Sequence, residues 1–162
     1  MAEEKTNVMR VLEQKKIPYT PHSYPHTEGE AVDGATVAAL LGRDPGEVYK
    51  TLVTRGASKA NYVFVVPVLA ELDLKKAAKT VGEKSIELIH VKELTPLTGY
   101  VRGGCSTIGM KKRFKTVVDA SAQAHAAILV SAGKIGRQVE LSPDALVGLI
   151  GGSFASVVKG DE

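Results

Sequence analysis

The apolar and polar positions of this 162-residue chain follow a helical period near the N-terminus and a strand period in much of the remainder. Val8, Val11 and Leu12 lie on one face of a helix, which predicts an amphipathic helix over residues 7–16. This helix should stop before Pro18, because the residue before a proline is pushed out of the helical region. Capping residues and terminal glycines predict further helical segments at residues 30–41, 44–47, 73–82, 91–99 (broken by Pro96) and 142–151.

From Tyr49 onward, several stretches are rich in β-branched and aromatic residues, as strands are. Residues 49–55 and 61–68 flank a Gly-Ala-Ser-Lys turn, which is typical of a β-hairpin. Further strands are predicted at residues 85–89, 100–104, 115–120, 127–131, 137–141 and 154–158. Since several strands follow one another without helices between them, the sheet should be mixed and mostly antiparallel. We therefore expect a single α/β domain over residues 1–162, with one curved, barrel-like central sheet surrounded by helices.

The composition is that of an ordinary soluble domain, with 44% hydrophobic and 24% charged residues. The first 16 residues are charged throughout, so no secretory signal is expected. The longest uncharged run, residues 145–158, contains glycines and is too short to cross a bilayer. A single cysteine cannot form an internal disulfide, which is compatible with a reducing cytosol. We expect a cytoplasmic protein without a membrane segment, whose oligomeric state the sequence leaves open.

The net charge of +3 is unevenly distributed along the chain. Residues 94–139 contain seven Lys or Arg residues and one acid, Asp119, which gives this segment +6 and the rest of the chain −3. Such a segment indicates a polyanionic partner, because neutralising phosphates releases counterions. The alternative is a solvated face whose acidic partners are distant in sequence but close in space. Charge alone leaves both open.

Cys105 and two histidines are the first candidates for reactive or metal-binding groups. A cysteine nucleophile needs a base or a lowered pKa, and burial as a small apolar residue is the more common role of a free cysteine. His22 and His26 have the spacing of a helical metal-ligand pair, but Pro21 and Pro25 forbid that helix. We therefore expect neither a cysteine nucleophile nor a metal site.

Glycine turns and lysines are the remaining candidates, because the sequence has no dinucleotide-binding, P-loop or nucleophile-elbow motif. Gly103 and Gly104 end a predicted strand, where backbone N–H groups can bind a phosphate or stabilise an oxyanion. Lys50 stands at the start of an apolar strand. Both have ordinary alternatives: many glycine pairs merely turn the chain, and a lysine at a strand edge often only snorkels to solvent.

Five segments contain these glycines and lysines: residues 48–52, 72–79, 98–104, 109–113 and 130–134. In order and spacing, and over essentially the whole chain, they resemble the YbaK/EbsC family of freestanding aminoacyl-tRNA deacylases. The segments LDLKKAAK and TGY-x-x-GG-x-S are similar to the branch of the family that acts on Cys-tRNA(Pro). A related module occurs within bacterial prolyl-tRNA synthetases.

The resemblance implies an α/β domain that removes cysteine mischarged onto tRNA(Pro), with no cofactor. It implies that Lys50 holds the 3′-terminal adenosine or its phosphate and that the Gly103 N–H orients the ester carbonyl and stabilises charge on it. The residues that it places around the substrate are Tyr24, Thr51, Gly104, Ser131 and Gly133. The residues that it assigns to the tRNA backbone are Lys75, Lys76, Lys111, Lys112, Arg113, Lys134 and Arg137. Prolyl-tRNA synthetase is a further expected partner.

The resemblance also implies that the cysteinyl thiol of the substrate attacks its own ester, giving a cyclic thioester and free tRNA. Three positions depart from the family pattern: Ile135 replaces an expected Arg, Asp33 an aromatic residue and Thr107 a proline. These changes alter the expected pocket walls and leave open the alternative of a broader amino-acid preference that includes Ala or Ser. Two other classes remain open, a tRNA- or nucleotide-binding module without catalysis and a small-molecule hydrolase that uses Cys105.

Overall fold

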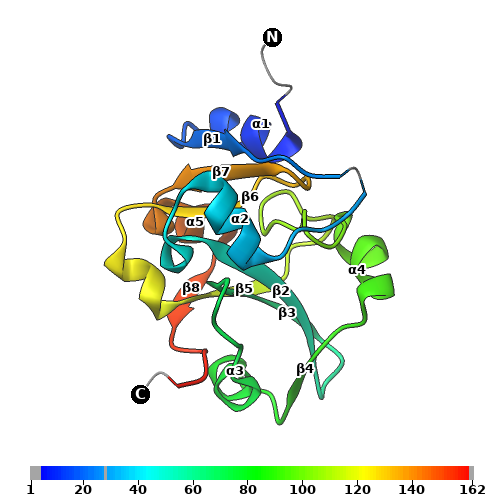
Figure 1. Cartoon of the computed structure of the whole chain (residues 1–162). Helices are drawn as coiled ribbons and strands as arrows, with labels where there is room; N and C mark the ends of the chain where they lie inside the picture. Colours follow the sequence, from blue (N-terminus) through cyan, green and yellow to red (C-terminus); the bar gives the residue numbers. More distant parts are fainter. Residues whose placement is uncertain (1–4, 28, 161–162) are drawn as a thin grey trace.

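Two open β-sheets form the centre of the computed structural model, which describes residues 5–27 and 29–160 (Figure 1). The three-stranded sheet is antiparallel throughout, and the five-stranded sheet is mixed, with β5 parallel to β3 and β8. The order in the first sheet is β1 (Thr20–Ser23), β7 (Arg137–Leu141) and β6 (Ile128–Ser131). The order in the second is β4 (Ile86–Leu88), β2 (Tyr49–Gly56), β3 (Asn61–Pro67), β5 (Lys115–Asp119) and β8 (Ser153–Ala155).

The single central sheet expected from the sequence is divided in two. One bridge, between Val48 and Leu129, joins the sheets, and neither sheet closes, so the barrel-like shape is not confirmed. At the end of β5, the Asp119 carboxylate accepts hydrogen bonds from the N–H groups of Ser121 and Val157. The bond from Ser121 caps the 3₁₀ helix η2 (Ala120–Ala124), and the chain then continues into β6, which pairs with β7 and not with β5. The expected single α/β domain with mixed strands is confirmed in its coarser form.

Local capping sets the ends of most helices, as the sequence predicts for Asp44, Asp73 and Ser142. The helix predicted from residue 30 instead begins at Gly34, after the cap Asp33. Asp33, Asp73 and Ser142 each accept a hydrogen bond from a backbone N–H of the first helical turn, which satisfies groups that the helix leaves unbonded. Gly42 and Gly82 end two of these helices in the left-handed conformation. The helices are α1 (Asn7–Gln14), α2 (Gly34–Leu41), η1 (Pro45–Glu47), α3 (Leu74–Val81), α4 (Val91–Thr98) and α5 (Pro143–Ile150).

Two local predictions in the middle of the chain are wrong. Helix α4 continues through Pro96, which removes one intrahelical hydrogen bond from an exposed two-turn helix without breaking it. Residues 100–104 form a turn and not a strand, since the Gly104 N–H bonds to the Val101 carbonyl at 3.0 Å and Gly103 has a φ of +86°. Of the apolar residues of this loop, Tyr100 packs against the core, whereas Val101 is exposed.

Apolar side chains cover both faces of the five-stranded sheet. Val65 of β3 packs toward α1, α5 and the three-stranded sheet, whereas Phe64 and Val66 pack toward α3 and the C-terminal segment. Strands buried on both faces read as continuous apolar runs, which explains the sequence of β3. Within the described residues, no helix is long and apolar enough to cross a membrane.

Replacing Phe64 is expected to test the importance of this packing for stability. Phe64 is completely buried, so Phe64→Ala should lower the free energy of unfolding by about 3–5 kcal/mol through lost burial and a residual cavity. Urea unfolding followed by circular dichroism measures this difference. Leu40→Ala is the control, because Leu40 is 44% exposed and should change the free energy by less than about 0.5 kcal/mol. Equal effects of the two substitutions would contradict the assignment of the core.

Candidate functional site

A small cavity of about 110 Å³ lies where β2, β6, β7, α2 and the turn at residues 101–104 meet, and we call it the Lys50 pocket. Its walls are largely apolar, with a few polar groups that converge on the same space, as in many ligand sites. Of the predicted site residues, the structure brings together five here: Tyr24, Lys50, Thr51, Gly103 and Ser131.

Lys50 carries the cationic group of this pocket. It is the second residue of β2, and its ammonium Nζ donates a hydrogen bond to the Val68 carbonyl at 3.3 Å. Burial lowers the pKa of Lys50, and the negative charge of Glu71 offsets part of that effect. A partly desolvated ammonium with one backbone partner retains donors for an anionic or carbonyl oxygen of a ligand.

Gly103 places its backbone against the pocket in a way that no other residue could. Its φ of +86° is strained for residues with a side chain, and an added Cβ would lie 2.8 Å from the Cβ of Ala31. Gly104 does not line the pocket: a Cβ there would lie 3.0 Å from the backbone N of Ile135, so this glycine lets the turn pack on the next loop. The structure places Gly104 beside the pocket and not on its wall, and its predicted contact with the substrate stays a prediction.

Ser131 and Gln138 face each other across β6 and β7. The Ser131 hydroxyl accepts a hydrogen bond from the Gly133 N–H at 3.1 Å, and Gly133 itself packs toward Tyr100 and Val8 outside the pocket. Gly133 therefore positions the hydroxyl of a residue that lines the pocket, and its own predicted contact with the substrate stays a prediction.

Gln138 is a pocket residue that the sequence analysis missed. Its side chain is 6% exposed, and its carboxamide oxygen is buried without a hydrogen-bond partner among the described residues. Such an oxygen is costly to leave unpaired, and a ligand N–H group could satisfy it. The pairing of β6 with β7 places Gln138 opposite Ser131. This position could not be recognised from the sequence without knowing the strand register.

Cys105 lines the Lys50 pocket but is poorly suited to attack a substrate. Burial raises the pKa of its thiol to about 12, with a partial opposing effect from a hydrogen bond with Thr98, so the thiol is protonated at neutral pH. The pocket residues in the described part of the chain include no histidine that could act as its base. His22 instead contacts Glu140 at 2.9 Å, and His26 contacts the Tyr24 carbonyl. Across the described ranges, no group of three His, Cys, Asp or Glu residues is placed to hold a metal ion.

The residues that depart from the family pattern have different positions. Asp33 caps α2, where hydrogen bonds from the Thr36 hydroxyl and N–H lower the pKa of its carboxyl, and it does not line the Lys50 pocket. Ile135 lies against Gly103, since its Cγ1 is 3.4 Å from the position of an added Cβ. Thr107 lines a separate cavity. Of these three residues, Ile135 is therefore the one whose position can affect the shape of the pocket.

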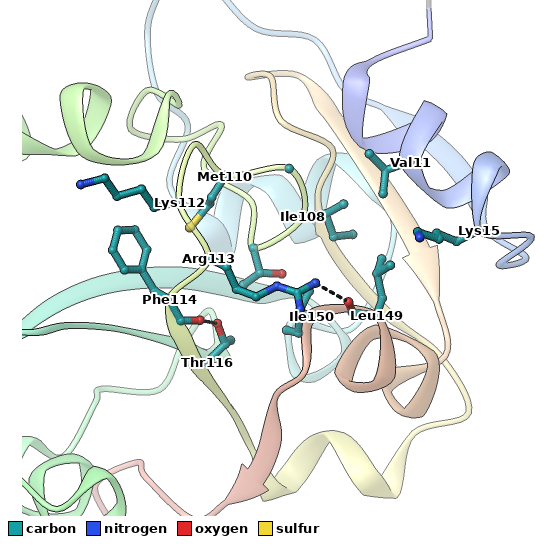
Figure 2. Close-up of a pocket in the computed structure, with 12 residues that line it drawn as sticks. Val11, Lys15, Ile108, Met110, Lys112, Arg113, Phe114, Thr116, Leu149 and Ile150 are labelled. Carbon is teal, nitrogen blue, oxygen red and sulfur yellow. Dashed lines mark hydrogen bonds between the residues drawn. The ribbon is translucent and has the colours of Figure 1, made fainter.

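The predicted tRNA-binding residues are divided between separate parts of the surface. Lys112 and Arg113 line a second cavity of about 290 Å³ with Lys15 and several apolar residues (Figure 2). The Arg113 guanidinium donates to the Leu149 carbonyl at 3.4 Å, and the Lys111 ammonium to the Pro96 carbonyl at 3.2 Å. These three side chains are exposed and form one basic loop.

The other predicted tRNA contacts lie elsewhere. Lys75 and Lys76 are on α3, which in Figure 1 is at the opposite end of the molecule from α1, and the Lys76 ammonium donates to the Val158 carbonyl at 3.0 Å. Lys134 is exposed in the β6–β7 turn. Arg137 is only partly exposed and contacts the sulfur of Met9 at 3.8 Å. The basic residues thus form several groups and not one stripe.

Comparison with known proteins gives a family for this arrangement. The model of the aminoacyl-tRNA editing domain matches residues 28–149. The chain belongs to this family. This editing domain is 47% identical, over 96% of its length and 94% of the other protein, to an Enterococcus faecalis protein assigned as the Cys-tRNA(Pro)/Cys-tRNA(Cys) deacylase EbsC. The family predicted from the sequence is confirmed.

Solved structures show the same fold at lower sequence identity. The editing domain matches the crystal structure of a hypothetical protein with a TM-score of 0.83 and 24% identity, covering 94% of this chain and 99% of the other. It matches a protein described as a trans-editing enzyme for prolyl-tRNA synthetase with a TM-score of 0.80 and 23% identity, covering 94% and 95%. This chain therefore shares its two sheets and surrounding helices with these solved structures over nearly its whole length.

Proposed function

We propose that this editing domain removes cysteine from mischarged Cys-tRNA(Pro) by cleaving the aminoacyl ester. The observation that carries the proposal is the Lys50 pocket, a cavity of about 110 Å³ that combines a lysine ammonium, a glycine turn and a buried amide oxygen. This space is suited to a small aminoacyl group. The family and the name of the relative from E. faecalis support an aminoacyl-tRNA substrate and cysteine as its amino acid.

In the proposed reaction the nucleophile belongs to the substrate. The cysteinyl sulfur attacks the ester carbonyl carbon, the new S–C bond closes a cyclic thioester, and the C–O bond to the ribose breaks. The thiol proton passes to the leaving ribose oxygen, and water later opens the thioester to cysteine. The pKa of about 12 for Cys105 agrees with this assignment, because a protonated thiol is a weak nucleophile.

The protein then acts by orientation and electrostatics. The Gly103 N–H stabilises negative charge on the carbonyl oxygen, and the Lys50 ammonium binds the adenosine end of the ester. The Gln138 oxygen accepts a hydrogen bond from the substrate α-ammonium group. Tyr24, Thr51 and Ser131 shape the walls. An alanyl ester could fit the same walls, since an apolar pocket discriminates by only about 1–3 kcal/mol per methylene, but it would lack the attacking thiol.

The tRNA body and the prolyl-tRNA synthetase belong to the same proposal. Lys111, Lys112 and Arg113 contact the tRNA backbone from the basic loop, and Lys134 from the turn beside Gly104. A small deacylase gains tRNA selectivity by acting in a complex with the synthetase, and the proposal places the protein in the cytoplasm, where this enzyme works. Co-purification with synthetase and tRNA(Pro) tests the complex, and recovery of no complex would count against it.

The deciding experiment measures deacylation of Cys-, Ala-, Ser- and Pro-tRNA(Pro) by the purified protein. Rapid loss of cysteine alone, with a transient cyclic thioester detected by mass spectrometry, is the expected result. Equal loss of alanine would contradict attack by the substrate thiol. Salt-sensitive binding without any deacylation would instead make the chain a non-catalytic tRNA-binding module.

Replacing Cys105 separates this proposal from a hydrolase that uses the protein thiol. Cys105→Ser should leave the rate of Cys-tRNA(Pro) deacylation close to that of the wild type, because the attacking sulfur comes from the substrate. The serine hydroxyl can keep the contact with Thr98. Single-turnover deacylation of radiolabelled Cys-tRNA(Pro) measures the rate. Complete loss of activity in a variant with an unchanged melting temperature would assign the nucleophile to Cys105.

A further inference from the structure

The cavity of about 290 Å³ in Figure 2 lies between α1, α5 and the loop at residues 107–114, and we call it the Arg113 cavity. It shares no lining residue with the Lys50 pocket. Its lining is largely apolar and includes the buried Ile108 and Ile150 together with Val11 and Leu149. The proposed deacylation uses none of these four apolar residues, so the cavity needs a separate explanation.

Hydrogen bonds hold the loop that forms one wall of the Arg113 cavity. The Ile108 carbonyl accepts a bond from the Tyr100 hydroxyl, and the Ile108 N–H donates to the Ser106 hydroxyl at 3.2 Å. The Lys111 N–H donates to the Thr98 carbonyl at 3.0 Å. The wall is therefore formed before any ligand binds, and a ligand does not have to order it.

The charged residues that line the Arg113 cavity are cationic. Lys15 reaches it from the end of α1 and Arg113 from the loop, and no Asp or Glu is among its described lining residues. Glu13, the acidic residue of α1, is bound by the Lys5 ammonium at 2.7 Å. Asp144 is in the first turn of α5, whereas the cavity lies at the last turn. This distribution of charge favours an anionic ligand.

The Arg113 guanidinium keeps donors for such an anion. It donates one bond, at 3.4 Å, to the Leu149 carbonyl in the last turn of α5. A guanidinium has five N–H donors in a planar fork that matches a carboxylate, so this bond orients the group and leaves other donors available. Binding to a helix C-terminus is an ordinary role for an arginine, but it does not account for the apolar cavity beside it. Lys112 points away from Val11 and Leu149 in Figure 2.

We propose that the Arg113 cavity binds a small organic carboxylate with an apolar chain. The carboxylate lies at Arg113 and Lys15, and the chain lies against Ile108, Leu149 and Ile150. A water molecule takes up about 30 Å³ of the liquid, so the cavity has room for roughly ten groups of that size. Octanoate has about that number of non-hydrogen atoms and is therefore a suitable probe. This inference does not depend on the proposed deacylase function.

Methyl NMR spectroscopy with octanoate is the first test. With ¹³C-labelled isoleucine methyl groups, octanoate should shift the signals of Ile108 and Ile150 and leave those of Ile86 and Ile135 in place. Ile86 packs in another part of the core, and Ile135 reports on the Lys50 pocket because it lies against Gly103. Octan-1-ol lacks the charge and acetate lacks the chain, so each should bind at least about tenfold more weakly than octanoate.

The second test measures the Kd of octanoate in three charge variants by isothermal titration calorimetry. Arg113→Gln should raise the Kd about tenfold, because it removes charge-assisted hydrogen bonds, and Lys15→Gln should raise it in the same direction. Lys112→Gln is the matched control: it removes the same charge from a side chain that points outward, and should change the Kd by less than about twofold. All three side chains are exposed, so the variants should keep the fold.

Three results would overturn the proposal. Shifts at Ile135 without shifts at Ile108 and Ile150 would place octanoate in the Lys50 pocket. Equal affinities for octanoate and octan-1-ol, or an unchanged Kd in Arg113→Gln, would show that no carboxylate site exists at Arg113. Shifts of Ile108 and Ile150 with uncharged tRNA(Pro) but not with octanoate would make the cavity part of the tRNA-binding surface.

Discussion

Lys50→Ala is expected to lower kcat/KM for Cys-tRNA(Pro) by about 100-fold or more, because it removes a preorganised cationic donor from a partly desolvated site. The Lys50 ammonium is positioned by its bond to the Val68 carbonyl, and Lys50 lines the Lys50 pocket. No other lysine or arginine among the described residues lines the Lys50 pocket, so the loss should not be compensated by a neighbour.

The loss of activity should not be accompanied by a loss of stability. Burial lowers the pKa of Lys50, which means that the folded state disfavours its charged form relative to the unfolded chain. Removing that ammonium should therefore leave the melting temperature unchanged or raise it. Lys50→Met, which keeps most of the alkyl chain, should behave in the same way, and Lys84→Ala, at an exposed site outside the pocket, is the matched control.

The pH dependence gives an independent readout of the same group. If the charged ammonium binds the substrate, activity should fall as the pH rises through the pKa of Lys50, and this fall should begin at a lower pH than for an ordinary lysine. Lys50→Arg keeps a charge at all these pH values and should lose that fall while retaining part of the activity. Wild-type kinetics in Lys50→Ala would show that the assignment of this lysine is wrong.

Gly103→Ala is expected to reduce kcat by about 100-fold, since a displacement of about 1 Å in a positioning group can cost that much. The φ of +86° alone would strain an alanine by about 1–2 kcal/mol. The added Cβ would also lie 2.8 Å from the Cβ of Ala31 and 3.1 Å from its Cα, so the turn must move. Movement of the turn should shift the Gly103 N–H away from the carbonyl oxygen that we propose it stabilises.

Two further variants separate displacement of the turn from general backbone strain. Gly82 has a φ of +76° with nothing within 4 Å of an added Cβ, so Gly82→Ala carries similar strain at a site outside the pocket and should keep its activity. Combining Gly103→Ala with Ala31→Gly removes the closest clash and should restore part of kcat. Single-turnover deacylation measures both. No rescue in the double variant, or an equal loss in Gly82→Ala, would contradict the explanation.

The sequence by itself determined the features that depend on neighbours a few residues apart. The caps Asp73 and Ser142 and the glycine ends of the helices depend on hydrogen bonds within one helical turn. The hairpin of β2 and β3 depends on the short turn between the two strands. Short sequence motifs also identified the family. All these features depend on residues that are close together in the chain, so the sequence alone was enough to predict them.

The tertiary structure alone decided how distant segments meet. The Asp119 carboxylate binds the N–H of Val157, which is distant in sequence. Gly104 and Gly133 support the pocket without lining it, and Gln138 enters the pocket because its register places it opposite Ser131. Lys50 of β2 likewise shares a further cavity with Leu88 of β4 and Leu74 of α3. Such contacts depend on strand pairing and packing between residues far apart in the chain, and a one-residue change of register would reverse the face of each side chain.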